Sequence, residues 1–181
     1  EGGMITTNDE DLAEKISLLR NHGGKTSEHG MTFQANGFNY RMSEIQAALG
    51  IAQMKRIDEI LSDRRATAQI YIEQLTGVSG IIIPLSTSEQ NCTFQSFVVL
   101  LEEGIDRNSV IRYMKEQGIE TTLGTYALHA HQAFARFGYE PGSLQNSWFN
   151  QNYSLTLPLL SKMKEETINQ VVFALKNALK I

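Results

Sequence analysis

A capping-box pattern at Ser43 and Gln46 opens the longest helical periodicity in the sequence and divides the chain into two regions. In such a box the serine side chain accepts from the backbone N–H three residues on, and the glutamine side chain reaches back to the serine N–H. Apolar residues then recur at helical spacing as far as Leu75, and Gly77 ends the pattern. We therefore predict one long linking helix over residues 43–77.

The region before this helix, residues 1–42, has the elements of a larger α/β domain but too few to enclose a core. Residues 4–7 predict a short strand, and Asn8 is placed to cap a helix that the sequence Asn21-His22-Gly23-Gly24 ends. Residues 22–42 are polar, with little periodicity, and predict a long loop. We expect this region either to self-associate over its exposed apolar surface or to be disordered.

The region after the helix, residues 78–181, predicts a small C-terminal domain of the α/β class. Strands are expected at residues 81–83, 94–101 and 119–123, with a helix capped by Asp106 between the last two. Strand, helix and strand at this spacing indicate a βαβ unit. Further helices are predicted at residues 144–152 and 168–179.

Composition narrows the classes of function. The 181 residues carry a formal net charge of −4, which argues against nucleic acid as a partner. No apolar run approaches the roughly 20 residues that a membrane helix needs. With a single cysteine and no signal peptide, a cytoplasmic protein is expected.

His129 and His131 lack a third ligand at a recognisable spacing, so we expect no metal site.

The most informative segment runs from Gly37 to Gly50. It places Asn39, Tyr40 and Arg41 on a loop that leads into a helix N-terminus, which is a natural anion site. The same residues could serve only to cap and anchor the long helix. Spacing alone leaves both interpretations open.

Several long segments in the right order resemble the DegT/DnrJ/EryC1/StrS aminotransferase family. They are residues 37–50, 1–13 and 18–23, followed by shorter matches at residues 118–120, 128–129 and 157–159. The resemblance covers essentially the whole chain. It implies the C-terminal part of a fold-type I transferase that depends on pyridoxal 5'-phosphate: a small α/β domain, the linking helix, and a remnant of the large cofactor-binding domain.

The resemblance also implies a function. Such enzymes are homodimers that convert nucleotide-linked keto-sugars to amino-sugars, with glutamate or glutamine as the amino donor. The resemblance assigns Asn39 to the cofactor phosphate of the neighbouring subunit, with Tyr40 and Arg41 as phosphate or substrate neighbours. His129 and His22 are assigned to the substrate.

The family's Schiff-base lysine lies a few residues before the segment that matches Glu1–Gly3. The resemblance therefore implies that residues 1–181 hold no catalytic residue, that they are part of a longer protein, and that they are inactive alone. Leu160 stands where the family often has histidine. Two alternatives stay open: a sugar dehydratase on the same scaffold, and a stand-alone dimerisation or regulatory module without catalysis.

Overall fold

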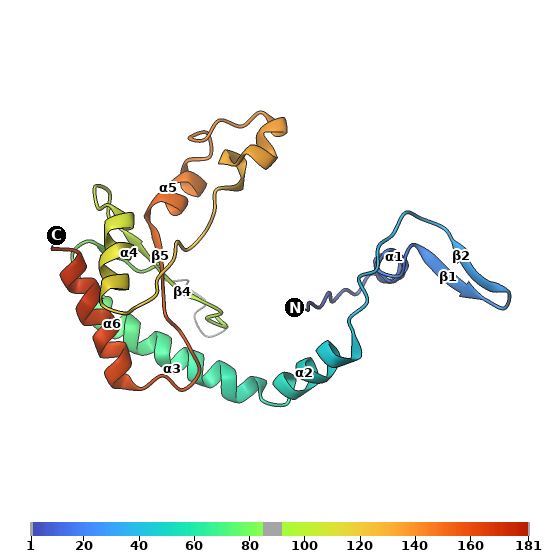
Figure 1. The fold of residues 1–181 in the computed structure, drawn as a ribbon, viewed down its shortest axis with the longest axis horizontal. Helices are drawn as coiled ribbons and strands as arrows, with labels where there is room; N and C mark the ends of the chain where they lie inside the picture. Colours follow the sequence, from blue (N-terminus) through green and yellow to red (C-terminus); the bar gives the residue numbers. More distant parts are fainter. Residues whose placement is uncertain (1, 85–91, 181) are drawn as a thin grey trace. The chain divides into compact units, whose positions relative to one another are not determined.

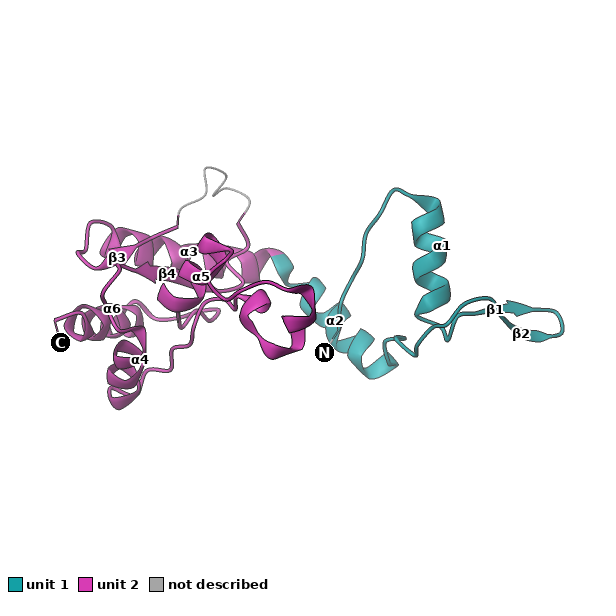
Figure 2. Ribbon diagram, turned by 90° about the horizontal axis from the view of Figure 1, so that it is seen from above, with its two compact units in different colours: residues 1–57 teal, residues 58–181 magenta. Residues whose placement is uncertain are grey.

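The computed structural model describes residues 2–84 and 92–180. The chain divides into two compact units, which we describe separately: unit 1, Glu1–Ile57, and unit 2, Asp58–Ile181 (Figures 1 and 2). Within the part of the chain that is described, no helix is both long and apolar enough to cross a membrane.

Unit 1 begins with an extended segment and helix α1, Glu10–Leu19. The strand predicted at residues 4–7 is not formed, because no neighbouring strand pairs with it, and Met4 is 83% exposed. The helix cap is Asp9, one residue later than predicted. Its side chain accepts a hydrogen bond from the Leu12 N–H at 2.9 Å, which satisfies a donor of the first turn.

The predicted long loop of residues 22–42 contains a β-hairpin instead. Strands β1, Gly24–Ser27, and β2, Gly30–Phe33, pair antiparallel in a register that sets Ser27 opposite Gly30. Apart from Gly24, every residue of the two strands is exposed. Because neither face of the hairpin is covered, no alternation of apolar and polar residues marks it in the sequence.

The capping box is confirmed at the start of helix α2, Glu44–Met54. The Gln46 N–H donates to Ser43 Oγ at 3.3 Å, and the Ser43 N–H donates to Gln46 Oε1 at 3.0 Å. The single long helix is wrong, because α3, Ile57–Leu75, starts separately after a tightened turn in which the Arg56 N–H bonds the Gln53 carbonyl. No glycine or proline marks this break.

Unit 2 is built on a three-stranded antiparallel sheet in the order β3-β4-β5. Its strands are β3, Ile81–Ile82, β4, Phe97–Leu101, and β5, Ser154–Leu157. The predicted βαβ unit is therefore wrong. Of residues 119–123 only Thr122 joins the sheet, as an isolated bridge to Thr156, while the unpredicted strand β5 takes the place beside β4.

The helices of unit 2 largely confirm the sequence predictions. They are α4, Arg107–Glu116, α5, Gln145–Tyr153, and α6, Glu165–Ala178, with two short 3₁₀ segments, η2, Leu128–Ala130, and η3, Gln132–Phe137. Strand β4 alternates, so that Phe97, Val99 and Leu101 are buried. These side chains form one core with residues of α3, α4, α6 and β5. The buried Tyr71 hydroxyl donates to the Pro158 carbonyl at 2.8 Å, and burial raises the pKa of this phenol.

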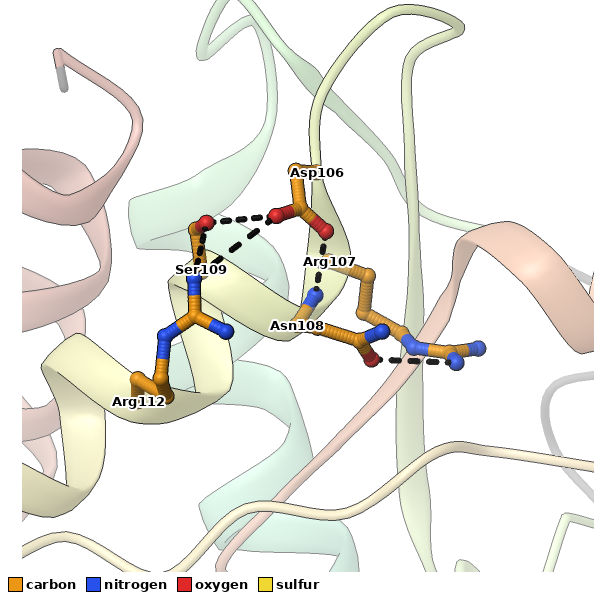
Figure 3. A network of polar contacts seen from close by, with 5 residues as sticks. All are labelled: Asp106, Arg107, Asn108, Ser109 and Arg112. Carbon is orange, nitrogen blue, oxygen red and sulfur yellow. Dashed lines mark hydrogen bonds and ion pairs between the residues drawn. The ribbon is translucent and has the colours of Figure 1, made fainter.

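Figure 3 shows the polar network at the start of α4. As predicted, Asp106 caps the helix by accepting from the Asn108 N–H at 3.0 Å, and it also accepts from the Ser109 hydroxyl at 2.5 Å. The Ser109 hydrogen bond lowers the pKa of the Asp106 carboxyl. Arg107 turns toward α5, where Nη1 donates to the Gln151 carbonyl.

Candidate functional site

Two of the segments singled out in the sequence lie side by side in unit 1. Residues 37–41 run antiparallel to residues 19–23, with Asn21 and Asn39 directly opposite each other as an isolated β-bridge. Backbone hydrogen bonds join the segments from His22 N to Phe38 O, from Tyr40 N to Arg20 O, and from Phe38 N to Leu19 O, at 2.9, 2.9 and 2.8 Å.

Two glycines allow this close approach. A Cβ at Gly37 would lie 2.2 Å from the Gly23 nitrogen and 2.6 Å from the Leu19 carbonyl oxygen. Gly23 itself has a φ of +70°, and a Cβ there would lie 1.8 Å from the Ala35 carbonyl oxygen. No side chain larger than hydrogen fits at either position, so the glycines determine how near the two segments come.

One face of the paired segments is polar. Asn21 and Asn39 form a pair without mutual backbone hydrogen bonds, the arrangement in which opposed side chains lie closest. Arg41 reaches the same face, where its Nη1 donates to Asn21 Oδ1 at 2.5 Å. The Asn39 side-chain amide bonds none of the residues described here, so its N–H groups are available to a ligand. We call Asn21, Asn39 and Arg41 the polar face.

The other predicted residues of this region lie elsewhere on the segment. The Tyr40 ring stacks on Phe38, with centroids 5.2 Å apart and planes at 17°, and 71% of the Tyr40 surface is exposed. Since side chains alternate along an extended segment, this ring belongs to the opposite side from Asn39. His22 is exposed and has a φ of +60°.

His129 lies in unit 2 and is buried in the short helix η2. Its Nε2 lies 2.7 Å from the Pro141 carbonyl oxygen, and the ring meets Tyr139 edge-on with centroids 6.5 Å apart. A carbonyl can only accept, so Nε2 carries the proton of the pair. In the neutral ring, Nδ1 is then an acceptor.

Side chains that the sequence did not single out hold the segment before His129. Ser154 Oγ accepts from the N–H groups of Gly124 at 3.0 Å and Thr125 at 3.2 Å. Gln151 Oε1 accepts from the Ala127 N–H at 2.7 Å. Polar residues on short elements such as α5 and β5 leave no spacing signal, so sequence patterns alone could not identify this role.

The lysines of the described residues all lie at or near the surface. Lys25 pairs with Glu14 at 2.6 Å, and this hydrogen bond raises the pKa of Lys25, which keeps the amine protonated. The others are exposed or, for Lys176, half-buried: Lys15, Lys55, Lys115, Lys162, Lys164, Lys176 and Lys180. Across residues 2–84 and 92–180, no three His, Cys, Asp or Glu side chains gather as metal ligands would.

Comparisons with known proteins show which family the chain resembles. The model of the DegT/DnrJ/EryC1/StrS aminotransferase family matches residues 1–176. GDP-perosamine synthase of Caulobacter vibrioides is 34% identical over 182 residues, which cover 99% of this chain and 48% of the synthase.

Two solved structures share the fold. S. venezuelae DesV has a TM-score of 0.83 at 26% identity, covering 97% of this chain and 46% of DesV. Helicobacter pylori PseC, an aminotransferase involved in the biosynthesis of pseudoaminic acid, has a TM-score of 0.83 at 20% identity, covering 96% and 47%. The chain thus spans about half the length of the relatives that it matches. The family match over nearly all its residues shows that the chain belongs to the DegT/DnrJ/EryC1/StrS aminotransferase family.

Proposed function

We propose that residues 1–181 contribute one wall of the active site to an aminotransferase that transfers an amino group from glutamate or glutamine to a nucleotide-linked keto-sugar. The observation that carries the proposal is the polar face, where two family motifs are joined by backbone hydrogen bonds and present Asn39 and Arg41 together.

The cofactor of this family is pyridoxal 5'-phosphate. Its phosphate needs N–H donors, and charge-assisted bonds from a guanidinium are among the strongest available. The unpartnered amide of Asn39 and the guanidinium of Arg41 are donors of this kind on one exposed face, so the residues fit the group. When bound, the cofactor supplies the electron sink for the reaction, while these side chains would hold and orient its phosphate.

We propose that the enzyme is a homodimer, with Asn39 reaching the cofactor phosphate of the neighbouring subunit. Two observations support this. Asn39 and Arg41 are exposed, and the helix that follows them, α2, buries none of its residues and exposes Ile45 and Leu49, one turn apart on the same side, at 78 and 65%. An apolar helix face of this size favours a covering partner.

We propose, from the resemblance and for each residue separately, that His22 and His129 contact the substrate and that Tyr40 is a phosphate or substrate neighbour. For His129 the proposed contact is through Nδ1, which can accept from a sugar hydroxyl while the Pro141 bond fixes the ring. Leu160, which stands where the family often has histidine, is 66% exposed. We propose that this replacement changes the sugar that is accepted.

We also propose that residues 1–181 alone do not bind the cofactor covalently. The test is to incubate this chain with pyridoxal phosphate, reduce with borohydride and locate the adducts by mass spectrometry. We expect scattered, substoichiometric labelling of exposed lysines. A stoichiometric adduct at one lysine would contradict the proposal.

The function itself is tested in the enzyme that contains this segment. Asn39→Ala and Arg41→Ala should each weaken pyridoxal phosphate binding about tenfold, the usual effect of losing a hydrogen bond to a charged group. Asn146→Ala, in the exposed part of α5, is the matched control. Unchanged cofactor affinity in both variants would contradict the assignment of Asn39 and Arg41 to the cofactor phosphate. Loss of water from the sugar, with no amino group transferred to it, would instead support a dehydratase.

A further inference from the structure

We infer that Asn21 is a positioning residue of this site. It holds the Arg41 side chain on the polar face, beside Asn39, where both can bind the phosphate. The inference rests on the proposed function, because it gives Asn21 a role only if Asn39 and Arg41 bind an anion. It extends that function to a residue on the other of the two paired segments.

The backbone register brings Asn21 to this site. Asn21 lies directly opposite Asn39, and the bonds that flank this pair, His22 N to Phe38 O and Tyr40 N to Arg20 O, fix both Cα positions. Two opposed side chains in such a pair share one face of the ribbon. The backbone therefore brings the Asn21 amide to the group that we propose binds phosphate.

The side-chain amide of Asn21 forms a hydrogen bond at each of its two ends. Its Oδ1 accepts from Arg41 Nη1 at 2.5 Å, and its Nδ2 donates to the Gly24 carbonyl at 3.4 Å. A guanidinium only donates and a carbonyl only accepts, so the two partners define the orientation of the amide. Both ends are engaged within the chain, and Asn21 acts through Arg41 rather than on the ligand.

The group that holds Arg41 is neutral. A long arginine side chain loses considerable rotamer freedom when it is fixed, so a preformed hydrogen bond lowers that loss when the ligand arrives. An aspartate at position 21 would hold Arg41 more tightly, but it would cancel the cationic charge and repel a phosphate. An amide fixes the guanidinium and leaves its charge for the anion.

The test uses the ¹⁵N-labelled 181-residue chain and inorganic phosphate as the probe. One readout is the phosphate affinity, followed on the Asn39 side-chain amide signals or, in Asn39→Ala, on the Arg41 Nε signal. The second readout is the rotation of the Arg41 guanidinium, which NMR detects as broadening of its Nη–H signals. The variants are Asn21→Ala, Asn21→Asp, Asn39→Ala and Arg41→Ala, with Asn146→Ala as the control.

We expect Asn21→Ala to free the rotation of Arg41 and to weaken phosphate binding about fivefold to tenfold. Asn21→Asp should keep the rotation restricted and yet weaken phosphate binding at least as much, because of the added negative charge. A residue with a merely structural role would not separate the two readouts in this way. Slow hydrogen exchange at the His22 and Tyr40 N–H groups checks that the paired backbone is intact.

The outcomes separate the two claims. If Asn39→Ala and Arg41→Ala leave the phosphate response unchanged, the proposed function is wrong. If those two variants weaken phosphate binding but the Arg41 guanidinium rotates as freely in the unsubstituted chain as in Asn21→Ala, the positioning role is wrong. If Asn21→Ala disrupts the backbone pairing, Asn21→Asp decides, and a phosphate affinity equal to that of the unsubstituted chain would overturn the inference.

Discussion

The Ser154 hydroxyl accepts the backbone N–H of Gly124 at 3.0 Å, and this contact leaves no room for a side chain at position 124. A Cβ there would lie 2.5 Å from Val98 Cγ1 and 2.8 Å from Ser154 Cβ. Strand β4 and the first residue of β5 thus hold the segment that leads to His129.

Gly124→Ala should destabilise unit 2 by about 1–3 kcal/mol, since a methyl group is forced into packed atoms. The free energy of unfolding from urea denaturation, monitored by circular dichroism, measures the change. Gly142→Ala is the matched control, because a Cβ at Gly142 meets no atom within 4 Å. Equal stability of the two variants would contradict the described packing.

Gly37→Ala should separate the two paired segments of unit 1, because its Cβ would meet the Gly23 nitrogen. We expect faster hydrogen exchange at the Tyr40 N–H and a loss of the phosphate response of Asn39. Gly50→Ala, in helix α2, is the control, since its Cβ meets nothing within 4 Å. Protection of Tyr40 that survives Gly37→Ala would argue against the close approach.

The cap of α4 should give stability that depends on pH. The hydrogen bond from Ser109 lowers the pKa of Asp106 in the folded chain below its ordinary value of 3.8. The folded state therefore favours the carboxylate. Its contribution to stability is fully present above the pKa that Asp106 has in the unfolded chain, and it is lost as the pH falls through the lower pKa of Asp106 in the folded chain. Since Asp106 is exposed, the effect on stability is expected to be small.

An NMR titration of the Asp106 carboxyl, in the chain and in Ser109→Ala, measures the effect. We expect the midpoint to rise in the variant. A midpoint that is unchanged by the loss of the hydroxyl would show that the bond in Figure 3 does not control this titration.

The 181-residue chain should associate through the apolar side of α2. Leu49→Glu places a charge among exposed apolar residues of that helix, so it should lower the mean mass measured by light scattering across a concentration series. Phe173→Glu is the control, because Phe173 is similarly exposed, at 69%, on α6 in unit 2. An equal effect of both changes would place the association elsewhere.

Local signals in the sequence predicted the helices well. Ser43 and Asp106 were recognisable caps because each side chain bonds a nearby N–H, and α6 buries a regular apolar stripe. The strands of the sheet were harder to predict from the sequence than the helices. Strand β5 has only four residues, and its pairing with β4 joins residues far apart in the chain, which no local pattern encodes.

The site was predictable only in part. Asn39 and Arg41 were accessible through motif resemblance, and their loop position indicated an anion site. The role that we propose for Asn21 was not, because it depends on the register between two segments that only the fold brings together. The bonds of Gln151 and Ser154 to the segment before His129 have the same origin. The assignments of Asn39, Tyr40 and Arg41 to the cofactor and of His22 and His129 to the substrate all stay predictions.

The antiparallel pairing of β4 with β5 has a consequence for biosynthesis. Phe97 cannot find its partner until Leu157 has emerged from the ribosome, and the core also needs α6, whose last buried residue is Ala178. The hairpin of unit 1, by contrast, closes over neighbouring residues and can form as soon as it is made. During translation, the apolar faces of α3 and β4 would therefore stay uncovered for most of the synthesis of unit 2, and apolar surface left uncovered in this way promotes aggregation.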